Sequence, residues 1–170
     1  GDRFILRLPA PAGTVAGGEV LLVARRKARW RRAVDRHTAQ ALSQGDTLGA
    51  LLAEAGPAGV SVQEAGARLG WTGEELEQKA KEAEGSGTLV RWGPEGWWLT
   101  ASEGKAWTQR ATAWLESRQG GKGPVEWLPR QEFLGRWQRM LGPVRAEALL
   151  EALAASGVVE IERDRVRTAG

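Results

Sequence analysis

The sequence contains no cysteine, only one histidine and no long apolar run. Without thiols the chain has no disulfides and no thiolate chemistry, and nothing in its composition indicates secretion. A lone histidine, His37, without any cysteine argues against a transition-metal site. No stretch approaches the roughly 18 apolar residues that a membrane-spanning helix needs, and no signal-peptide pattern is found at the start. We therefore expect a cytoplasmic protein that binds neither metal nor membrane.

Catalytic motifs are scarce as well. The phosphate-binding loop G-x-x-x-x-G-K-[ST] is not found, because Gly104-Lys105 and Gly121-Lys122 lack both the upstream glycine and the following serine or threonine. Carboxylates such as Glu74 and Glu75 occur in runs that are typical of solvated helix faces. No nucleophile has a base at a recognisable spacing. The sequence therefore predicts that this chain is not an enzyme and holds no cofactor.

The positive charge of the chain is concentrated in one short segment. Residues 25–36 contain seven cations and a single carboxylate, Asp35, which gives a net charge of +6 in a chain whose total is +3. Cations this close repel one another unless a polyanion or an acidic surface lies nearby. We therefore predict contacts with nucleic-acid phosphates from Arg25, Arg26, Lys27, Arg29, Arg31, Arg32 and Arg36.

Residues 1–23 have the pattern of two β-strands. Apolar side chains alternate along Phe4–Leu8, a proline–glycine turn follows, and Val20–Val23 form a second apolar run. Two short strands bury too little surface to be stable alone. We therefore expect the closing strands of a β-barrel whose other strands lie upstream, so that this chain is a fragment of a longer protein.

After a basic linker at residues 24–30, residues 31–101 have the pattern of a winged-helix domain. Capping boxes at Ser61/Glu64 and Thr72/Glu75 mark the starts of two helices, and Val62, Ala65 and Leu69 form an apolar stripe on the first of them. The helices are expected at 31–42, 47–55, 62–69 and 73–84, and a hairpin at 88–93 and 97–100. Helices followed by a hairpin are the element order of a winged helix.

The same order recurs in residues 102–170. A helix beginning near Thr100 is followed by a short strand at 125–128, by a helix that Pro129 opens, by a helix at 144–155, and by a hairpin at 158–161 and 165–168. The pairs Ser86-Gly87 and Ser156-Gly157 give an internal period of about 70 residues. The predicted fold class is mainly α with small β-hairpins (α+β), as two tandem winged helices.

Nine tryptophans are present, and most fall at predicted core positions: Trp107, Trp114 and Trp137 lie on apolar helical stripes, and Trp92 lies in the first hairpin. Trp97 and Trp98 are adjacent in a predicted strand, so their side chains point to opposite faces. We expect Trp97 to pack inward and Trp98 to face outward over Arg91. An outward tryptophan in the hairpin favours packing against a neighbouring module over stacking on a base.

The third helix of a winged helix is the one before its hairpin, here residues 73–84 and 144–155. Both helices are poorly suited to reading DNA, which requires basic or amide side chains in the major groove. The first such helix has five glutamates against Lys79 and Lys81, and the second offers Arg145 against Glu147 and Glu151. Basic residues lie elsewhere, on the middle helix and the hairpin of the second module. The middle helix contributes Arg130, Arg136 and Arg139. The hairpin adds three more candidate phosphate contacts, Arg163, Arg165 and Arg167.

The segments Arg3–Arg7 (R-F-I-L-R) and Pro11–Leu21 (P-A-G-T-V-A-G-G-E-V-L) resemble the end of the third domain of bacterial selenocysteine-specific elongation factors, the SelB family. Ala16 stands where that family has the first glycine of its G-G-G turn. In the family a basic linker and a row of winged-helix domains follow, and the resemblance covers the whole chain in that order.

The resemblance implies a GTPase that delivers selenocysteinyl-tRNA to recoded UGA codons, with GTP and Mg bound in an upstream domain. The ribosome with its rRNA, the tRNA and an mRNA hairpin would be partners of the whole protein. This chain would be a monomeric spacer towards the hairpin-binding end, with auxiliary RNA contacts. Two alternatives stay open: a tandem winged-helix transcription regulator that binds DNA, and a winged-helix protein–protein adaptor.

Overall fold

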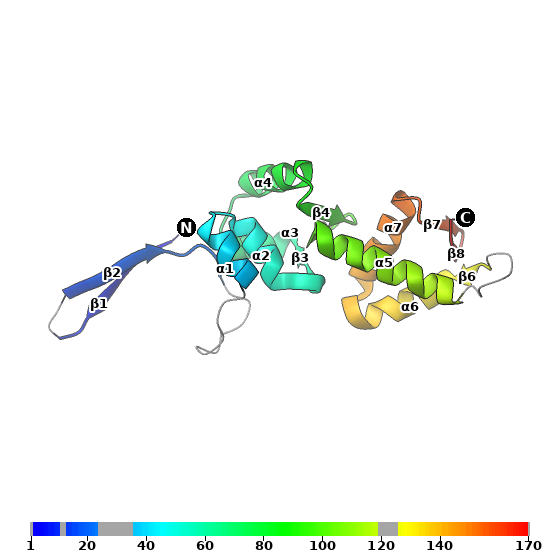
Figure 1. Cartoon of the computed structure of the whole chain (residues 1–170), viewed down its shortest axis with the longest axis horizontal. Helices are drawn as coiled ribbons and strands as arrows, with labels where there is room; N and C mark the ends of the chain where they lie inside the picture. Colours follow the sequence, from blue (N-terminus) through cyan, green and yellow to red (C-terminus); the bar gives the residue numbers. More distant parts are fainter. Residues whose placement is uncertain (1, 11–12, 24–35, 119–125, 170) are drawn as a thin grey trace.

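The computed structural model describes residues 2–10, 13–23, 36–118 and 126–169. The molecule is elongated, with a two-stranded ribbon at one end and two modules of helices and small sheets along the long axis (Figure 1). The described residues form a mainly helical α+β structure with small antiparallel sheets, as the sequence predicts. We call residues 36–100 the first module and residues 101–168 the second module.

The ribbon consists of β1 (Arg3–Leu8) and β2 (Gly13–Glu19), paired antiparallel. Its side chains are exposed on both faces, and no closed barrel is present among the described residues. The second strand was expected at Val20–Val23, and that position is wrong. Glu19 pairs with Arg3, the first residue of β1, and the amide of Val20 donates to the carbonyl oxygen of Asp2 (2.8 Å), so the chain before β1 is too short to pair with the rest of Val20–Val23.

Val20–Val23 instead lead the chain to the first module. The amide of Val23 donates to the carbonyl oxygen of Arg68 (3.2 Å), and Arg68 Nε donates to the carbonyl oxygen of Val23 (2.8 Å). The Arg68 guanidinium, which is 8 % exposed, also pairs with Glu54. Leu22 packs against the core of this module. The end of the ribbon is therefore held by a buried, doubly bonded arginine.

The first module contains a three-stranded sheet in the order β3-β5-β4 with helices against it. Its elements are α1 (Arg36–Ser43), α2 (Thr47–Ala55), the short 3₁₀ helix η1 (Gly56–Ala58), β3 (Val60–Ser61), α3 (Val62–Leu69), α4 (Gly73–Gly85), β4 (Leu89–Trp92) and β5 (Trp97–Thr100).

Local sequence sets the helix starts in this module. Thr72 and Glu75 form the full capping box at α4, and Ser61 Oγ accepts from the amide of Glu64 (3.1 Å) at α3. Ala65 and Leu69 on α3 are buried as predicted. Val62 is wrong as a core residue: it is 39 % exposed, because at the first position of α3 its side chain lies beside the Gly96 turn rather than over the sheet.

The second module repeats this arrangement, with a sheet in the order β6-β8-β7. Pro129 does not open α6 as predicted, because it pairs with Arg165 as the last residue of β6 and precedes the first helical residue. The short strand therefore begins at Leu128, the last residue of the expected strand 125–128. The elements are α5 (Ala101–Arg118), β6 (Leu128–Pro129), α6 (Arg130–Leu141), α7 (Pro143–Ala155), β7 (Val159–Glu162) and β8 (Arg165–Thr168).

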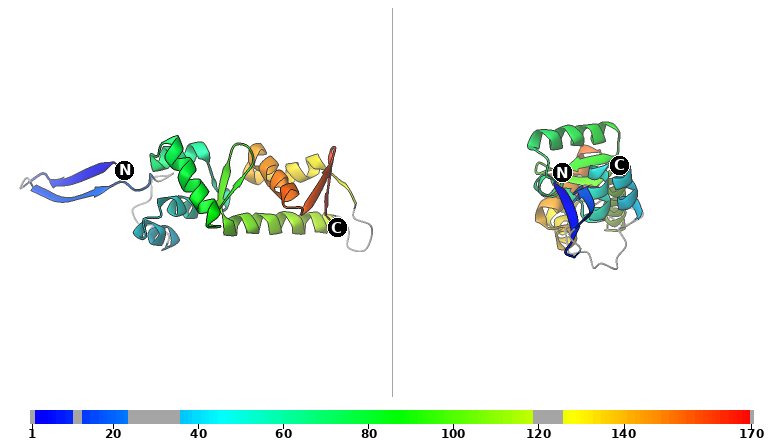
Figure 2. Two further views of the ribbon diagram at one scale, coloured as in Figure 1. Left: turned by 90° about the horizontal axis from the view of Figure 1, so that it is seen from above. Right: turned by 90° about the vertical axis from the view of Figure 1, so that its left-hand side faces the viewer.

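Strand β5 belongs to both modules. Trp98 is fully buried in the first core, whereas Trp97 and Leu99 face the second core, so the expected opposite orientation is confirmed. The expectation that Trp98 faces outward is wrong. Helices α2 to α4 pack on one face of the first sheet, and α5 and α7 of the second module pack on the other. Helix α5 begins beside the first sheet and extends along the second module (Figure 2).

Candidate nucleic-acid interface

Of the seven predicted phosphate contacts in residues 25–36, only the last can be placed. Arg36 is exposed and is the first residue of α1. The other six lie outside the described residues, and they are Arg25, Arg26, Lys27, Arg29, Arg31 and Arg32.

The hairpin arginines of the second module lie among carboxylates. Arg167 forms an ion pair with Glu160 across the strands (2.5 Å), and its guanidinium lies over the Trp127 ring at 4.5 Å. Arg165 is opposite Glu162 in the ladder, and Arg163 is an exposed turn residue with φ = 53°. Residues 160–167 therefore hold as many carboxylates as cations. This balance weakens their attraction for phosphate.

Helix α4, the last helix of the first module before its hairpin, is acidic and is tied to its own module. Arg91 on β4 binds Glu77 (2.8 Å) and Glu84 (2.6 Å), and the hydrogen bond that it donates to Glu84 raises the pKa of this guanidinium. Lys79 pairs with Glu82 (2.9 Å) on the same helix. The cations near α4 are thus occupied by its glutamates. This face would repel a phosphate backbone.

Helix α7, the third helix of the second module, faces the first module. Its only cation, Arg145, donates from Nη1 to the carbonyl oxygen of Ala58 (2.6 Å) and lies 5.8 Å from the centre of the Trp97 ring. A Cβ on Gly93 would come within 2.7 Å of Ala148 Cβ, so the turn that follows β4 is in close contact with α7. Arg145 therefore serves the junction between the modules and is not presented to a nucleic acid.

The carbonyl groups of η1 collect donors at this junction. Trp107 Nε1 donates to the carbonyl oxygen of Pro57 (2.8 Å), and Trp97 Nε1 donates to that of Ala58 (2.8 Å), which also accepts from Arg145. Such bonds satisfy indole and backbone groups that burial would otherwise leave without partners. Apolar packing and polar contacts both join the two modules.

At the seam between α5 and α6, arginines contact tryptophan rings, and these contacts were not predicted from the sequence. Three guanidinium groups lie over tryptophan rings of the second core. They are Arg110 over Trp107 (5.2 Å), Arg118 over Trp114 (5.8 Å) and Arg136 over Trp137 (5.3 Å). The first two contacts could have been predicted, because on a helix an arginine three or four residues after a tryptophan lies next to it.

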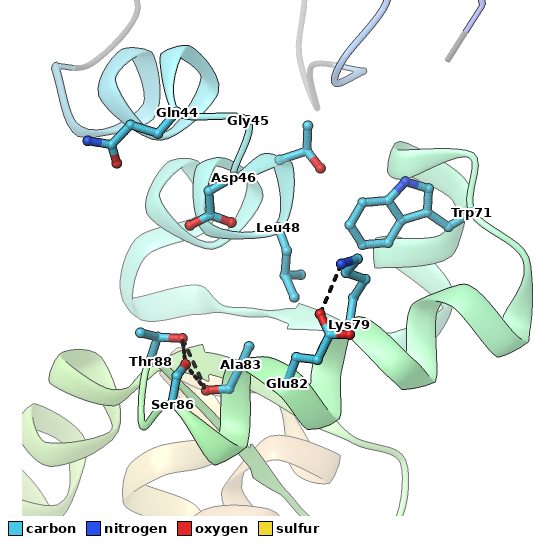
Figure 3. Close-up of a pocket in the computed structure, with 11 residues that line it drawn as sticks. Gln44, Gly45, Asp46, Leu48, Trp71, Lys79, Glu82, Ala83, Ser86 and Thr88 are labelled. Carbon is cyan, nitrogen blue, oxygen red and sulfur yellow. Dashed lines mark hydrogen bonds and ion pairs between the residues drawn. The ribbon is translucent and has the colours of Figure 1, made fainter.

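A cavity of about 400 Å³ lies between the α1–α2 turn, Trp71 and the C-terminal half of α4 (Figure 3). Its polar groups bond mainly within the protein. Lys79 pairs with Glu82, the hydroxyls of Ser86 and Thr88 donate to the carbonyl oxygen of Ala83, and an Asp46 carboxylate oxygen accepts from the amide of Gly49. The lining gives no arrangement of groups that points to a ligand.

Within the described parts of the chain, no three His, Cys, Asp or Glu residues converge to hold a metal ion. In the same residues, none of the helices combines the length and the apolar character that crossing a membrane requires.

We expect the stability of α4 to depend on pH through Glu75. Hydrogen bonds from the backbone amide and the hydroxyl of Thr72 hold the pKa of Glu75 below its ordinary value of 4.5. A depressed pKa stabilises the fold above pH 4.5, and this contribution is lost as the pH falls through the lowered pKa. The pKa of the Glu75 carboxyl, measured by NMR titration, should therefore be higher in Thr72→Ala than in the unaltered chain. The same midpoint in both proteins would contradict this assignment.

No protein-family model matches this chain, and a search of curated proteins gives no match either.

Proposed function

We propose that this chain is part of a GTP-dependent elongation factor that delivers selenocysteinyl-tRNA to recoded UGA codons. In this proposal the two modules are winged helices that hold the tRNA-binding and mRNA-binding ends of the factor at a fixed spacing. GTP and Mg would bind elsewhere in that factor. The resemblance of Arg3–Arg7 and Pro11–Leu21 to the SelB family motivates this proposal.

The element order supports winged helices in both modules. In each, a helix, a short strand, two helices and a hairpin follow one another, and the short strand pairs with the second strand of the hairpin. The two sheets have equivalent orders, β3-β5-β4 and β6-β8-β7. The hairpins would then be the wings, and α4 and α7 the third helices.

The observation that carries the spacer role is the two-sided burial of β5. Trp98 on one face and Trp97 and Leu99 on the other are all less than 5 % exposed, so one strand contributes to the cores of both modules. Separating the modules would expose this apolar surface at a cost of about 25 cal/mol per Å². A joint of this kind transmits position, whereas a flexible linker does not.

The same geometry favours a spacer over a regulator that reads DNA. Helix α4 presents glutamates, and the one cation of α7 is bound to Ala58 of the first module. Neither helix is arranged to insert basic side chains into a major groove. Contacts with RNA would therefore be auxiliary and would come from other surfaces.

A chimaera tests this proposal. The matching segment of a bacterial selenocysteine-specific elongation factor is replaced by this chain, and selenocysteine insertion is measured with a UGA reporter that carries the mRNA hairpin. Insertion of about ten Gly/Ser residues between Thr100 and Ala101 should reduce decoding tenfold or more, because a flexible joint lowers the effective concentration of the tethered ends.

The matched control carries the same Gly/Ser insertion between Arg163 and Asp164, at the tip of the β7–β8 hairpin, where the spacing of the ends is unaffected. The proposal expects this control to decode like the chimaera without an insertion. A chimaera that fails to decode, or that tolerates the insertion at Thr100, would contradict the spacer role.

A further inference from the structure

Three arginines on α5 and α6 lie outside the ion pairs of the described residues. Arg110, Arg136 and Arg139 are exposed, and none of them has a carboxylate partner among the residues that the structure describes. Other arginines of the second module are in ion pairs: Arg118 pairs with Glu132 (3.5 Å), Arg130 with Glu147, and Arg167 with Glu160. The seam therefore keeps positive charge that the hairpin of the same module has neutralised.

Two of these arginines are held in place by the aromatic core. Trp107 and Trp137 are each 3 % exposed and pack edge to face with centroids 5.9 Å apart. The guanidinium of Arg110 lies over the first ring and that of Arg136 over the second. The two cations thus cap one pair of buried indoles from neighbouring helices. Arg139 lies one turn after Arg136 on α6.

Stacking leaves the hydrogen-bonding edge of an arginine free. A guanidinium that lies over an aromatic ring uses its face, while its N–H groups, which point outward in the plane, remain able to bind a phosphate with two parallel hydrogen bonds. Because the ring limits the motion of the side chain, less conformational entropy is lost when phosphate binds. Arg110 and Arg136, whose guanidinium carbons lie 5.2 and 5.3 Å from the ring centres, are in reach of this contact.

We infer that the α5–α6 seam, formed by Arg110, Arg136 and Arg139, is the surface of the second module that binds an RNA phosphate backbone. The inference rests on the proposed function for the choice of RNA as the polyanion. A repeating phosphate chain suits a set of exposed guanidinium groups, each of which can take one phosphate. Recognition here is independent of base sequence, because no side chain of the set is arranged to read a base edge.

The test compares two triple variants of the whole chain with equal loss of charge. The seam variant is Arg110→Gln/Arg136→Gln/Arg139→Gln, and the control is Arg163→Gln/Arg165→Gln/Arg167→Gln. Binding of a fluorescein-labelled 12-base-pair RNA duplex is measured by anisotropy between 50 and 200 mM KCl. Each phosphate contact adds about 0.9 to the slope of log K against log salt.

We expect the seam variant to lose about 2.7 units of this slope, about 0.9 for each of its three arginines, and to bind at least tenfold more weakly at 100 mM KCl. The control variant should weaken by less than about threefold, because its arginines are already balanced by carboxylates. Near-ultraviolet circular dichroism checks that the indole packing survives. A Lys triple at the seam positions keeps the charge and should retain the slope while losing part of the affinity.

Equal losses in the two variants, or no loss in the seam variant, would overturn the inference. Poly-glutamate that competes with the duplex at equal charge would also overturn it, since the seam would then accept acidic proteins. Absence of RNA binding by the unaltered chain would overturn it too. That outcome leaves the spacer role standing, because the chimaera tests spacing without requiring RNA contacts from these modules.

Discussion

Replacing Trp97 by alanine lowers the free energy of unfolding by about 3–5 kcal/mol and uncouples the two modules. Trp97 is 4 % exposed, and its ring lies 5.5 Å from that of Trp92 and 6.3 Å from that of Trp107. Its truncation also removes the donor to the carbonyl oxygen of Ala58 and the ring beneath Arg145. The lost contacts lie on the face of β5 that the second module covers.

The measurement is urea unfolding, monitored by the hydrogen exchange of backbone amides. The unaltered chain should unfold in one transition, and Trp97→Ala in two, because the packing that couples the modules is reduced. Leu115→Ala provides the control: this leucine is fully buried in the second core, so its loss should lower stability without splitting the transition. One transition at an unchanged midpoint in Trp97→Ala would rule out β5 as the coupling element.

The second large effect that we expect is that of Gly59→Ala, which should lower the free energy of unfolding by about 3–5 kcal/mol. Gly59 has φ = 57° and ψ = −171°, a region that essentially only glycine adopts. A Cβ at this position would lie 2.4 Å from Trp97 Nε1 and 2.5 Å from the carbonyl oxygen of Trp98. Backbone strain and overpacking therefore add to each other.

The control for this substitution is Gly70→Ala. Gly70 has φ = 67° and ψ = 22°, ordinary left-handed values, and nothing lies within 4 Å of a Cβ built on it. Alanine there should cost about 1–2 kcal/mol from the backbone alone. Thermal unfolding of the two variants measures the difference. Equal losses would mean that the close approach of Gly59 to β5 contributes nothing.

Elements with strong local determinants could be predicted from the sequence. Helix α2 occupies the expected residues 47–55, and α4 begins at the Thr72/Glu75 capping box as expected, because a cap depends on residues only three positions apart. The hairpins at 89–100 and 159–168 follow likewise from their turns. The two-stranded ribbon was also expected. The position of its second strand could not be predicted, because it depends on where β1 begins.

Features that depend on packing between the modules could not be predicted in this way. The orientation of Trp98 depends on which helices cover each face of the first sheet, and α5 and α7 come from the following module. The role of Arg145 could not be predicted either, because it binds a carbonyl group 87 residues away. For the candidate interface, six of the linker cations lie outside the described residues, and the stacking of Arg110 and Arg136 requires knowledge of where Trp107 and Trp137 meet.

The line of indoles across the junction has an optical consequence. Trp92, Trp97, Trp107 and Trp137 follow one another at centroid distances of 5.5, 6.3 and 5.9 Å, and they come from both modules. Chromophores this close, fixed at steep angles, couple their electronic transitions and exchange excitation energy. The docked chain therefore carries its own spectroscopic reporter, and undocking of the modules would change its exciton circular dichroism and tryptophan emission without any attached dye.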